Sequence, residues 1–460
     1  GNNTVNARVK DFFYGYYYPL LLSIITIISY SIGTFGSFIG FTVLAAGTCV
    51  SLILFKDITT IFPPVLLFIM NFNDLSLIYH PYFCVISVIV GLFIAAHFVL
   101  YPPERIFIGK LFFPLIIVSV ALFCGGLLSD YLKDYPQGIE SAISVGPVIL
   151  FEYFLFSNYI KPPENFDIKH YLCILVITAA LTASATMFIY YIKHSIFRIG
   201  GDVGWGNTNA VSPLILLALP CACYLLTRSF KQLPYFALIV LLFVCMFCTE
   251  SDGALGIMCA CTPFLIVTTY FNSINRKKFA FVSSICITLG IILLFIVCIA
   301  FDIFSIINTS DSGRLTIYKK AIELYKKYPL FGVGLGYKDL NAFNPALSSF
   351  RQNNFHSVVL HVMATMGTVG LVSYIFYFVC RYKIFIGNSS RFNVYMTYAF
   401  TLFEFYALID TGEFVLFPLL CTITLITCVT EYTSMHASKN RSIRNNFIKT
   451  TQFDTTMFEN

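Results

Sequence analysis

The sequence is poor in charged residues, and this scarcity excludes most classes of soluble protein. Asp, Glu, Lys and Arg make up 11% of its 460 residues, whereas apolar residues make up 58%. Soluble globular proteins have roughly 25% charged residues. A soluble enzyme, a disordered chain and a nucleic-acid-binding protein are therefore excluded, which leaves an integral membrane protein built of helices.

Patterns that bind metals or form disulfides are also lacking. No pair or cluster of Cys and His suggests a metal site, although the chain has 15 Cys. Most of these Cys lie inside long apolar runs, where the thiol behaves as a small apolar side chain. The outer segments contain no Asp-x-Asp pair, and the sequence shows no internal repeat.

The long apolar runs predict an all-α, polytopic membrane protein with about 12 to 14 transmembrane helices, at about 20 residues per span. A barrel is excluded because the runs do not alternate between apolar and polar residues. The run at 58–72 is short and contains Pro63 and Pro64, which favours a broken or re-entrant helix. The spans are expected near 17–34, 36–55, 58–72, 82–101, 106–128, 141–160, 170–192, 210–228, 233–249, 252–271, 279–301, 357–380, 392–409 and 413–431.

Basic residues orient this layout, because cytoplasmic loops carry an excess of Lys and Arg. Counting spans from the basic clusters at 276–278, 381–391 and 439–449 places both termini in the cytoplasm. Most other basic residues then also lie inside, apart from those of one long outer segment. The start of the chain, 1–11, is polar and basic, and we interpret the apolar run after it as a retained span.

The chain therefore divides into four parts. Residues 1–301 form an N-terminal transmembrane bundle, 302–356 a long extracytoplasmic loop, 357–431 the C-terminal transmembrane helices and 432–460 a basic cytoplasmic tail. A loop of this length in a compact fold is usually functional. Three shorter outer segments also draw notice: 193–209, 249–253 and 410–413.

The long outer loop contains an amphipathic helix at 314–329. Leu315, Tyr318, Ile322 and Tyr325 recur at helical spacing, and five basic residues cover the rest of the segment. One interpretation is a helix that lies on anionic lipid head groups, with its lysines reaching toward the phosphates. The other is that some cations, Arg314 above all, face a cavity and bind a pyrophosphate, for which the planar guanidinium is well suited.

A glycine-rich stretch, 332–337, follows this helix. It is no Walker loop, and it either forms a tight turn or brings backbone N–H groups and Tyr337 close to a ligand. The loop then ends at His356, at the mouth of the next span, where a His can accept a proton near neutral pH or serve only as a polar anchor. His361, inside the helix, is the competing candidate.

Two further outer stretches carry polar groups. Residues 198–209 begin with Arg198 and hold the only Trp, Trp205, together with Asn207 and Asn209. They form either an interfacial anchor or a sugar platform, with the indole ring stacking and the amides bonding to hydroxyls. The corner at 249–253 carries two carboxylates that are either solvated or orient nearby cations.

These pieces, in this order, resemble the O-antigen ligase family, which includes related polysaccharide polymerases and teichoic-acid ligases of the bacterial envelope. The resemblance lies in Arg314, the following helix and glycine-rich turn, and FHSVVLHVMATMGTVGL at 355–371. WGNTNAVSPLIL at 205–216 also resembles a family stretch that opens a span. The chain departs from the family at Ser357, where many members have Asn, and at Asp252, where an Arg is common.

The resemblance implies a glycosyltransferase of surface-polysaccharide assembly in the bacterial cytoplasmic membrane. Its reaction is expected to need no cofactor, metal or nucleic acid. Its donor is a glycan on undecaprenyl pyrophosphate, its acceptor is a lipid or glycan hydroxyl, and membrane lipids surround it. His356 is then the base, and Arg314 and Arg198 hold the pyrophosphate, with Arg351 or Lys338 in place of the Arg that Asp252 replaces. A single displacement inverts the anomeric configuration.

Two alternatives stay open at the level of the sequence. A polymerase uses the same donor but joins it to another repeat unit rather than to a lipid or protein anchor. A flippase or other transporter of lipid-linked oligosaccharide is more distant, because transporters show inverted repeats and midplane charges. Here most charges lie at span ends, apart from Glu152 and Glu404.

Overall fold

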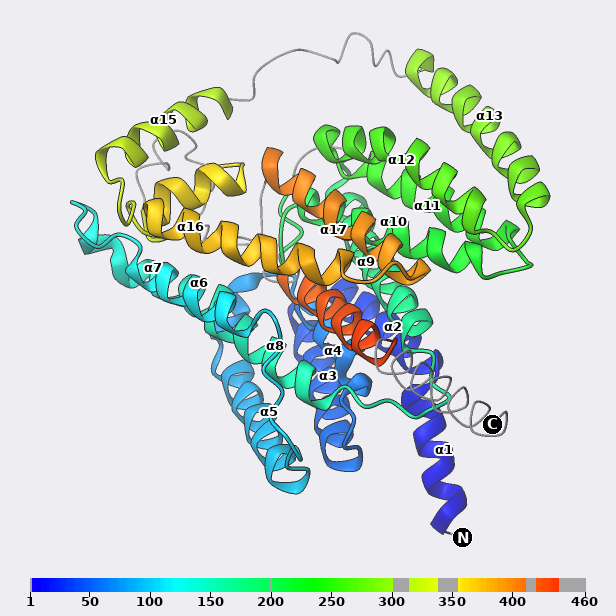
Figure 1. Cartoon of the computed structure of the whole chain (residues 1–460), viewed down its shortest axis with the longest axis horizontal. Coiled ribbons are helices and arrows are strands. Elements are labelled where there is room, and N and C mark those ends of the chain that lie inside the picture. The colour runs from blue at the N-terminus through cyan, green and yellow to red at the C-terminus, as the bar shows by residue number, and fades with distance from the viewer. Residues whose placement is uncertain (1, 198–200, 301–313, 338–354, 411–418, 438–460) are drawn as a thin grey trace, which may run out of the picture.

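The computed structural model confirms an all-α polytopic fold (Figure 1). It describes every residue except 1, 198–200, 301–313, 338–354, 411–418 and 438–460. Much of the long outer loop thus lies outside the described residues, but the amphipathic helix and the glycine-rich turn are inside them.

The described part of the chain is largely helical. Its helices are α1 (Asn2–Tyr14), α2 (Tyr17–Ile32), α3 (Thr34–Leu54), α4 (Phe62–Leu67), α5 (Pro81–Leu100), α6 (Phe112–Cys124), α7 (Tyr135–Val145), α8 (Pro147–Tyr159), α9 (Ile168–His194), α10 (Val211–Thr227), α11 (Leu233–Cys248), α12 (Asp252–Asn272), α13 (Arg276–Ala300), α15 (Arg314–Lys327), α16 (Val358–Ile386) and α17 (Arg391–Ile409). A further helix spans 419–437, and short 3₁₀ turns form at Thr59–Ile61, Phe68–Asn71, Leu75–Tyr79, Leu132–Asp134 and Thr208–Ala210.

Fewer helices are long enough to cross a membrane than the apolar runs predict. Among the described residues seven qualify by length and composition, or eight if the bent pair α1 and α2 forms one span. Several predicted spans are instead shorter apolar helices, such as the 13-residue α6. At 1.5 Å per residue such a helix reaches about 20 Å, less than the roughly 30 Å of the hydrocarbon core. The segment at 58–72 is indeed broken, with α4 between two 3₁₀ turns.

The centre of the bundle is α10, which packs against α9, α11, α12 and α17 (Figure 1). Every residue of α10 is buried, and small side chains such as Ala218, Cys221 and Ala222 let its neighbours approach closely. This central helix holds α9 and α17 in place. The start of α10 and the end of α17 come together, since the Tyr406 hydroxyl of α17 lies 3.2 Å from the carbonyl oxygen of Asn209, just before α10.

A buried ion pair joins α16 to α17. Arg381 in α16 donates to Glu404 Oε1 in α17 at 2.5 Å, and the Tyr374 hydroxyl donates to Glu404 Oε2 at 3.0 Å. The guanidinium also lies over the rings of Tyr377 and Phe400. Glu404, one of the two acidic residues that the sequence places within spans, is thus neutralised by a neighbouring helix, as buried charges require.

Candidate functional site

The amphipathic helix forms as predicted and packs onto the start of α16. Its inner face, with Ala321 and Leu324, joins a small core with Val333, Phe355 and Ala364. The helix is α15, and Arg314 is its first residue. This packing places Arg314 beside the first residues of α16, next to Phe355 and His356.

The glycine-rich turn locks α15 to a break in α16. Gly332 and Gly334 adopt positive φ values of 64° and 86°, which favour glycine. The turn's N–H groups at Val333 and Gly334 donate to the carbonyls of Ala364 and Thr365, both at 2.8 Å. The bonds end where α16 breaks, at Gly367 with φ 62°. These two N–H groups therefore stabilise the broken helix, and the hypothesis that they face an anion is wrong for them.

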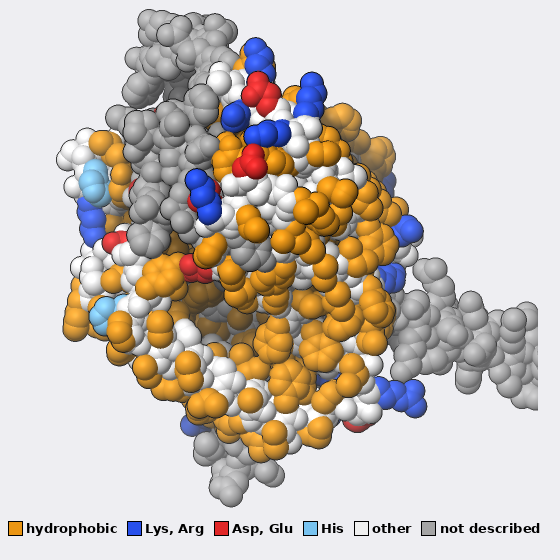
Figure 2. Space-filling view, turned by 90° about the vertical axis from the view of Figure 1, so that its left-hand side faces the viewer, with side chains coloured by type: hydrophobic (Ala, Val, Ile, Leu, Met, Phe, Trp, Pro, Cys, Tyr) orange, Lys and Arg blue, Asp and Glu red, His pale blue; other side chains and the backbone are white. Residues whose placement is uncertain are grey.

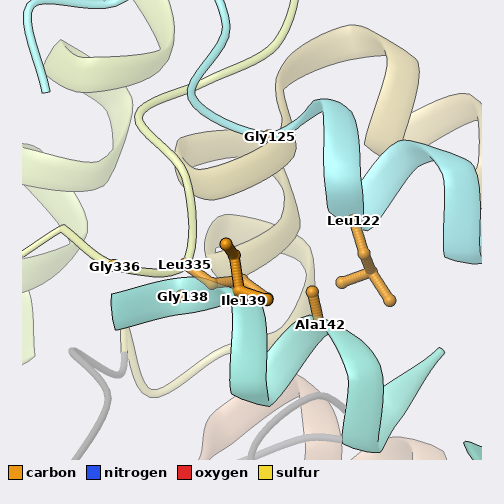
Figure 3. Close-up of a pocket in the computed structure, with 7 residues that line it drawn as sticks. All are labelled: Leu122, Gly125, Gly138, Ile139, Ala142, Leu335 and Gly336. Carbon is orange, nitrogen blue, oxygen red and sulfur yellow. The ribbon is translucent and has the colours of Figure 1, made fainter. Parts of the chain in front are cut away.

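The other side of the same turn packs against α6 and α7. Gly336 lies beside Gly138, and the cavity between them, drawn in Figure 3, holds only about 10 Å³, roughly the space of one water. A Cβ at Gly336 would lie 2.1 Å from the carbonyl oxygen of Asp134. Close backbone approach thus explains the glycines of the turn, and the approach is to protein rather than to a ligand.

His356 has an unusual backbone and a carboxylate partner. Its φ is 51°, a conformation that costs energy for a side chain with a Cβ and is common at functional sites. Its Nδ1 lies 3.0 Å from Oδ1 of Asp410, and its carbonyl oxygen accepts a bond from the Tyr318 hydroxyl at 3.1 Å. A helix residue of α15 and a carboxylate after α17 therefore fix the position of the imidazole.

Arg314 reaches the same carboxylate. One of its terminal nitrogens donates to the carbonyl oxygen of Ile409 at 3.1 Å, and the other lies 3.6 Å from Asp410 Oδ2. The structure thus brings together Arg314 and His356, the two residues predicted to be catalytic, and adds Asp410 between them. Two side chains of this cluster are about a third exposed, 37% for Arg314 and 35% for His356, so both remain open to a ligand.

Asp410 is the site residue that sequence reasoning missed. Its side chain is only 6% exposed, and the Tyr406 hydroxyl donates to its Oδ2 at 3.3 Å. A buried carboxylate is costly without partners, and Asp410 has them in Arg314, His356 and the Tyr406 hydroxyl. The feature of the sequence that could have pointed to Asp410 is its position in the segment 410–413, immediately after an apolar run.

Residues from two other segments lie beside this cluster. The Tyr406 hydroxyl lies 3.2 Å from the carbonyl oxygen of Asn209, just before α10. Gly253, at the start of α12, lies so close to Ile409 that a Cβ there would approach its side chain to 2.6 Å. Asn209, Gly253, Arg314, His356 and Asp410, which come from four separate stretches of the chain, therefore lie in one region.

The remaining candidates have different surroundings. Trp205 is 3% exposed, and its indole N–H donates to the Thr186 hydroxyl at 3.0 Å. Its ring is therefore covered by protein and offers no open face for a sugar. Tyr337 is buried edge-on against Tyr131, with ring centroids 4.6 Å apart. His361 is buried beside Phe355. Arg198, Lys338 and Arg351 lie outside the described residues.

The far end of α15 is anchored to the connection between α6 and α7. The Tyr328 hydroxyl and the Lys327 ammonium both contact Oδ2 of Asp130, the ammonium at 3.2 Å. These two contacts hold the pKa of the Asp130 carboxyl below its ordinary value. The hydrogen bond of Lys327 with Tyr328, and after it the contact with Asp130, raise the pKa of Lys327. Both ends of α15 are therefore tied to carboxylates, Asp410 at the first and Asp130 at the last.

A comparison with protein families supports the same region. Residues 237–375 match the family model described as O-antigen ligase, which confirms the resemblance seen in the sequence. The match includes Arg314, the glycine-rich turn and His356, and it ends before Asp410. No curated protein matches the chain. The match and the apolar helices indicate a multi-pass bacterial membrane protein, with an enzyme domain of the ligase or glycosyltransferase type used in polysaccharide assembly.

Proposed function

We propose that this protein transfers a glycan from undecaprenyl pyrophosphate to an acceptor hydroxyl at the outer face of the bacterial cytoplasmic membrane. The observation that carries the proposal is the meeting of His356, Arg314 and Asp410 at the mouth of α16. This cluster supplies a base, a cation and a group that orients both. Both termini lie in the cytoplasm in the proposed orientation, as the distribution of basic residues favours.

His356 acts as the general base. A carboxylate only accepts hydrogen bonds, so the Nδ1 that faces Asp410 carries the hydrogen and Nε2 is the nitrogen that accepts a proton. The acceptor oxygen attacks the anomeric carbon while its proton passes to Nε2. Such a base typically contributes about 10²- to 10⁴-fold in rate.

Arg314 stabilises the leaving group. As the bond between the anomeric carbon and the carrier oxygen breaks, the electron pair goes to the pyrophosphate, whose charge rises. In the described part of the chain the two terminal nitrogens of Arg314 contact Ile409 and Asp410, one contact each, whereas the guanidinium has five N–H donors, so donors remain for a phosphate. Losing one such preorganised donor typically costs about 3 kcal/mol, or a hundredfold or more in rate.

The remaining details of the reaction follow from the family resemblance. One displacement forms one glycosidic bond and inverts the anomeric carbon, with the protein's own cations, rather than a metal, balancing the charge. Arg198, Arg351 and Lys338 are proposed as additional donor contacts, and Asn209 is proposed on the sugar side. The sequence also favoured Trp205 and Tyr337 for the sugar, but both rings are buried against protein, so neither is proposed as a sugar contact. Asn209 is linked to the cluster through Tyr406, whose hydroxyl lies 3.2 Å from the carbonyl oxygen of Asn209 and 3.3 Å from Asp410 Oδ2.

The test measures transfer by purified protein with a lipid-linked donor and an acceptor in detergent. His356→Ala and Arg314→Ala are expected to lose at least a hundredfold in rate. His436→Ala and Arg276→Ala are matched controls, because both residues are exposed and lie on other elements. Normal transfer by both site variants, at equal amounts of folded protein, would remove these residues from the mechanism.

The same assay separates the ligase from its rivals. A ladder of products from a repeat-unit donor alone indicates a polymerase. A single addition to a lipid or other anchor indicates a ligase. Movement of the glycan across a proteoliposome membrane without a new glycosidic bond indicates a transporter and contradicts the proposal.

A further inference from the structure

The amphipathic helix α15 has a second apolar face that the site does not use. Leu315 and Ile322 are 52% and 40% exposed, and Leu330, just after the helix, is 48% exposed. Leu315 and Ile322 are seven residues apart, almost two turns, so they lie on one side of the helix. This side is opposite the inner face that packs on α16 through Ala321 and Leu324.

Lysines lie between these apolar residues. Lys319 and Lys326 occur four residues after Leu315 and Ile322, which places them on the same exposed stripe. Within the described part of the chain, neither forms an ion pair with a carboxylate, in contrast to Arg314 and Lys327. The stripe Leu315, Lys319, Ile322, Lys326 thus alternates an apolar body with a long cation, the pattern of a helix that lies in a membrane interface.

The fold places this stripe at the edge of the lipid-facing surface of α16. The backbone N–H of Val369 donates to the carbonyl oxygen of Leu330 at 3.2 Å, and the Tyr325 hydroxyl bonds to Thr368. One turn further, α16 exposes Val372 and Ile375. Figure 2 shows basic side chains gathered above a broad apolar surface on this side of the molecule. The apolar surface of the span therefore continues onto α15.

We propose that the stripe Leu315, Lys319, Ile322, Lys326 of α15 lies in the outer leaflet and binds the phosphates of anionic phospholipids. The leaflet follows from the proposed orientation, but the contact with lipid does not depend on the proposed reaction. The sequence left two interpretations of this helix: a surface helix bound to lipid, and a helix that presents Arg314 to a cavity. Both then apply together, because the lipid-binding residues and Arg314 belong to different faces of the helix.

Anionic phospholipid is favoured over a protein partner by charge and position. The segment 314–330 carries five basic residues and one acidic residue, Glu323. Each lysine at a membrane surface gives roughly a fivefold preference for anionic lipid. A protein partner would have to bind at the lipid boundary itself.

The experiment uses quenching of tryptophan by brominated lipids in nanodiscs that contain the full chain. Ile322→Trp reports on the stripe, and Thr316→Trp is the matched control, because Thr316 is exposed but about 100° round the helix from Leu315. The native Trp205 is buried and contributes the same background to both variants. We expect brominated phosphatidylcholine to quench the Ile322→Trp signal at least twofold more than the Thr316→Trp signal. Equal quenching would overturn the proposal.

A second arm tests the charge. At the same low mole fraction, brominated phosphatidylglycerol is expected to quench the Ile322→Trp protein several-fold more than brominated phosphatidylcholine does. Adding Lys319→Gln and Lys326→Gln is expected to abolish that preference while leaving quenching in pure brominated phosphatidylcholine. Equal quenching by the two lipids, or a preference that survives both substitutions, would refute the binding of anionic lipid.

Discussion

Replacing Asp410 with Asn tests how the cluster works, because it keeps the shape of the side chain and removes its charge. Asp410 Oδ2 receives the Tyr406 hydroxyl and faces Arg314, while Oδ1 faces Nδ1 of His356. In the Asn variant one of these two positions becomes an NH₂ group. Since the guanidinium and the hydroxyl are both donors, the amide oxygen remains on their side and the NH₂ group turns toward His356.

The consequence is the wrong tautomer of the imidazole. Facing an NH₂ donor, Nδ1 of His356 must accept, so the hydrogen moves to Nε2 and this nitrogen no longer takes a proton from the acceptor. The loss is bounded by the contribution of the base, about 10²- to 10⁴-fold in kcat. The KM for donor is expected to change much less, because Arg314 keeps its bond to the Ile409 carbonyl.

The assay is single-turnover transfer from a lipid-linked donor, with Asp130→Asn as the matched control. Asp130 is also a carboxylate that pairs with a cation of α15, but it lies at the other end of the helix. We expect the control to keep nearly normal turnover. An Asp410→Asn rate within about threefold of the unmodified protein, well below the contribution of a general base, would refute the assigned role of Asp410.

Three other predictions concern stability and pH. Gly367→Ala is expected to destabilise the protein by at least about 1 kcal/mol, because φ is 62° and a Cβ would lie 2.5 Å from the backbone of Leu330. The measurement is the thermal unfolding temperature in detergent, which should fall. Gly256→Ala, where a Cβ meets nothing within 4 Å, is the control. Glu404→Gln is expected to cost about 3 to 5 kcal/mol in the same measurement, since it leaves Arg381 buried without its charged partner, and an unchanged unfolding temperature would contradict this. The lowered pKa of Asp130 means that its contribution to holding α15 is present above the ordinary carboxyl pKa of 3.8 and is lost as the pH falls through its lower value in the folded protein; the protection of the α15 amides against hydrogen exchange should therefore fall in acid, and Asp130→Asn should show the lower protection already at neutral pH.

The positions of the site residues along the chain explain which of them could be predicted from the sequence. Arg314, the helix, the glycine-rich turn and His356 lie within one stretch, where helical spacing and turn chemistry are local properties. Asp410 lies 54 residues after His356 and looks like an ordinary residue of an outer turn. Its role depends on the packing of α17 beside α16, which no local pattern reports.

The sequence by itself determined the class of the molecule, because 58% apolar residues cannot be buried or solvated outside a membrane in so large a chain. It also determined α15, through the 3.6-residue spacing of its apolar side chains, and the family resemblance. Only the tertiary structure decided which apolar runs form helices long enough to span, because helix ends depend on packing, as in the 13-residue α6. It alone decided that Trp205 and Tyr337 are covered while Arg314 and His356 share a carboxylate, since burial and ion pairing join residues that are distant in sequence.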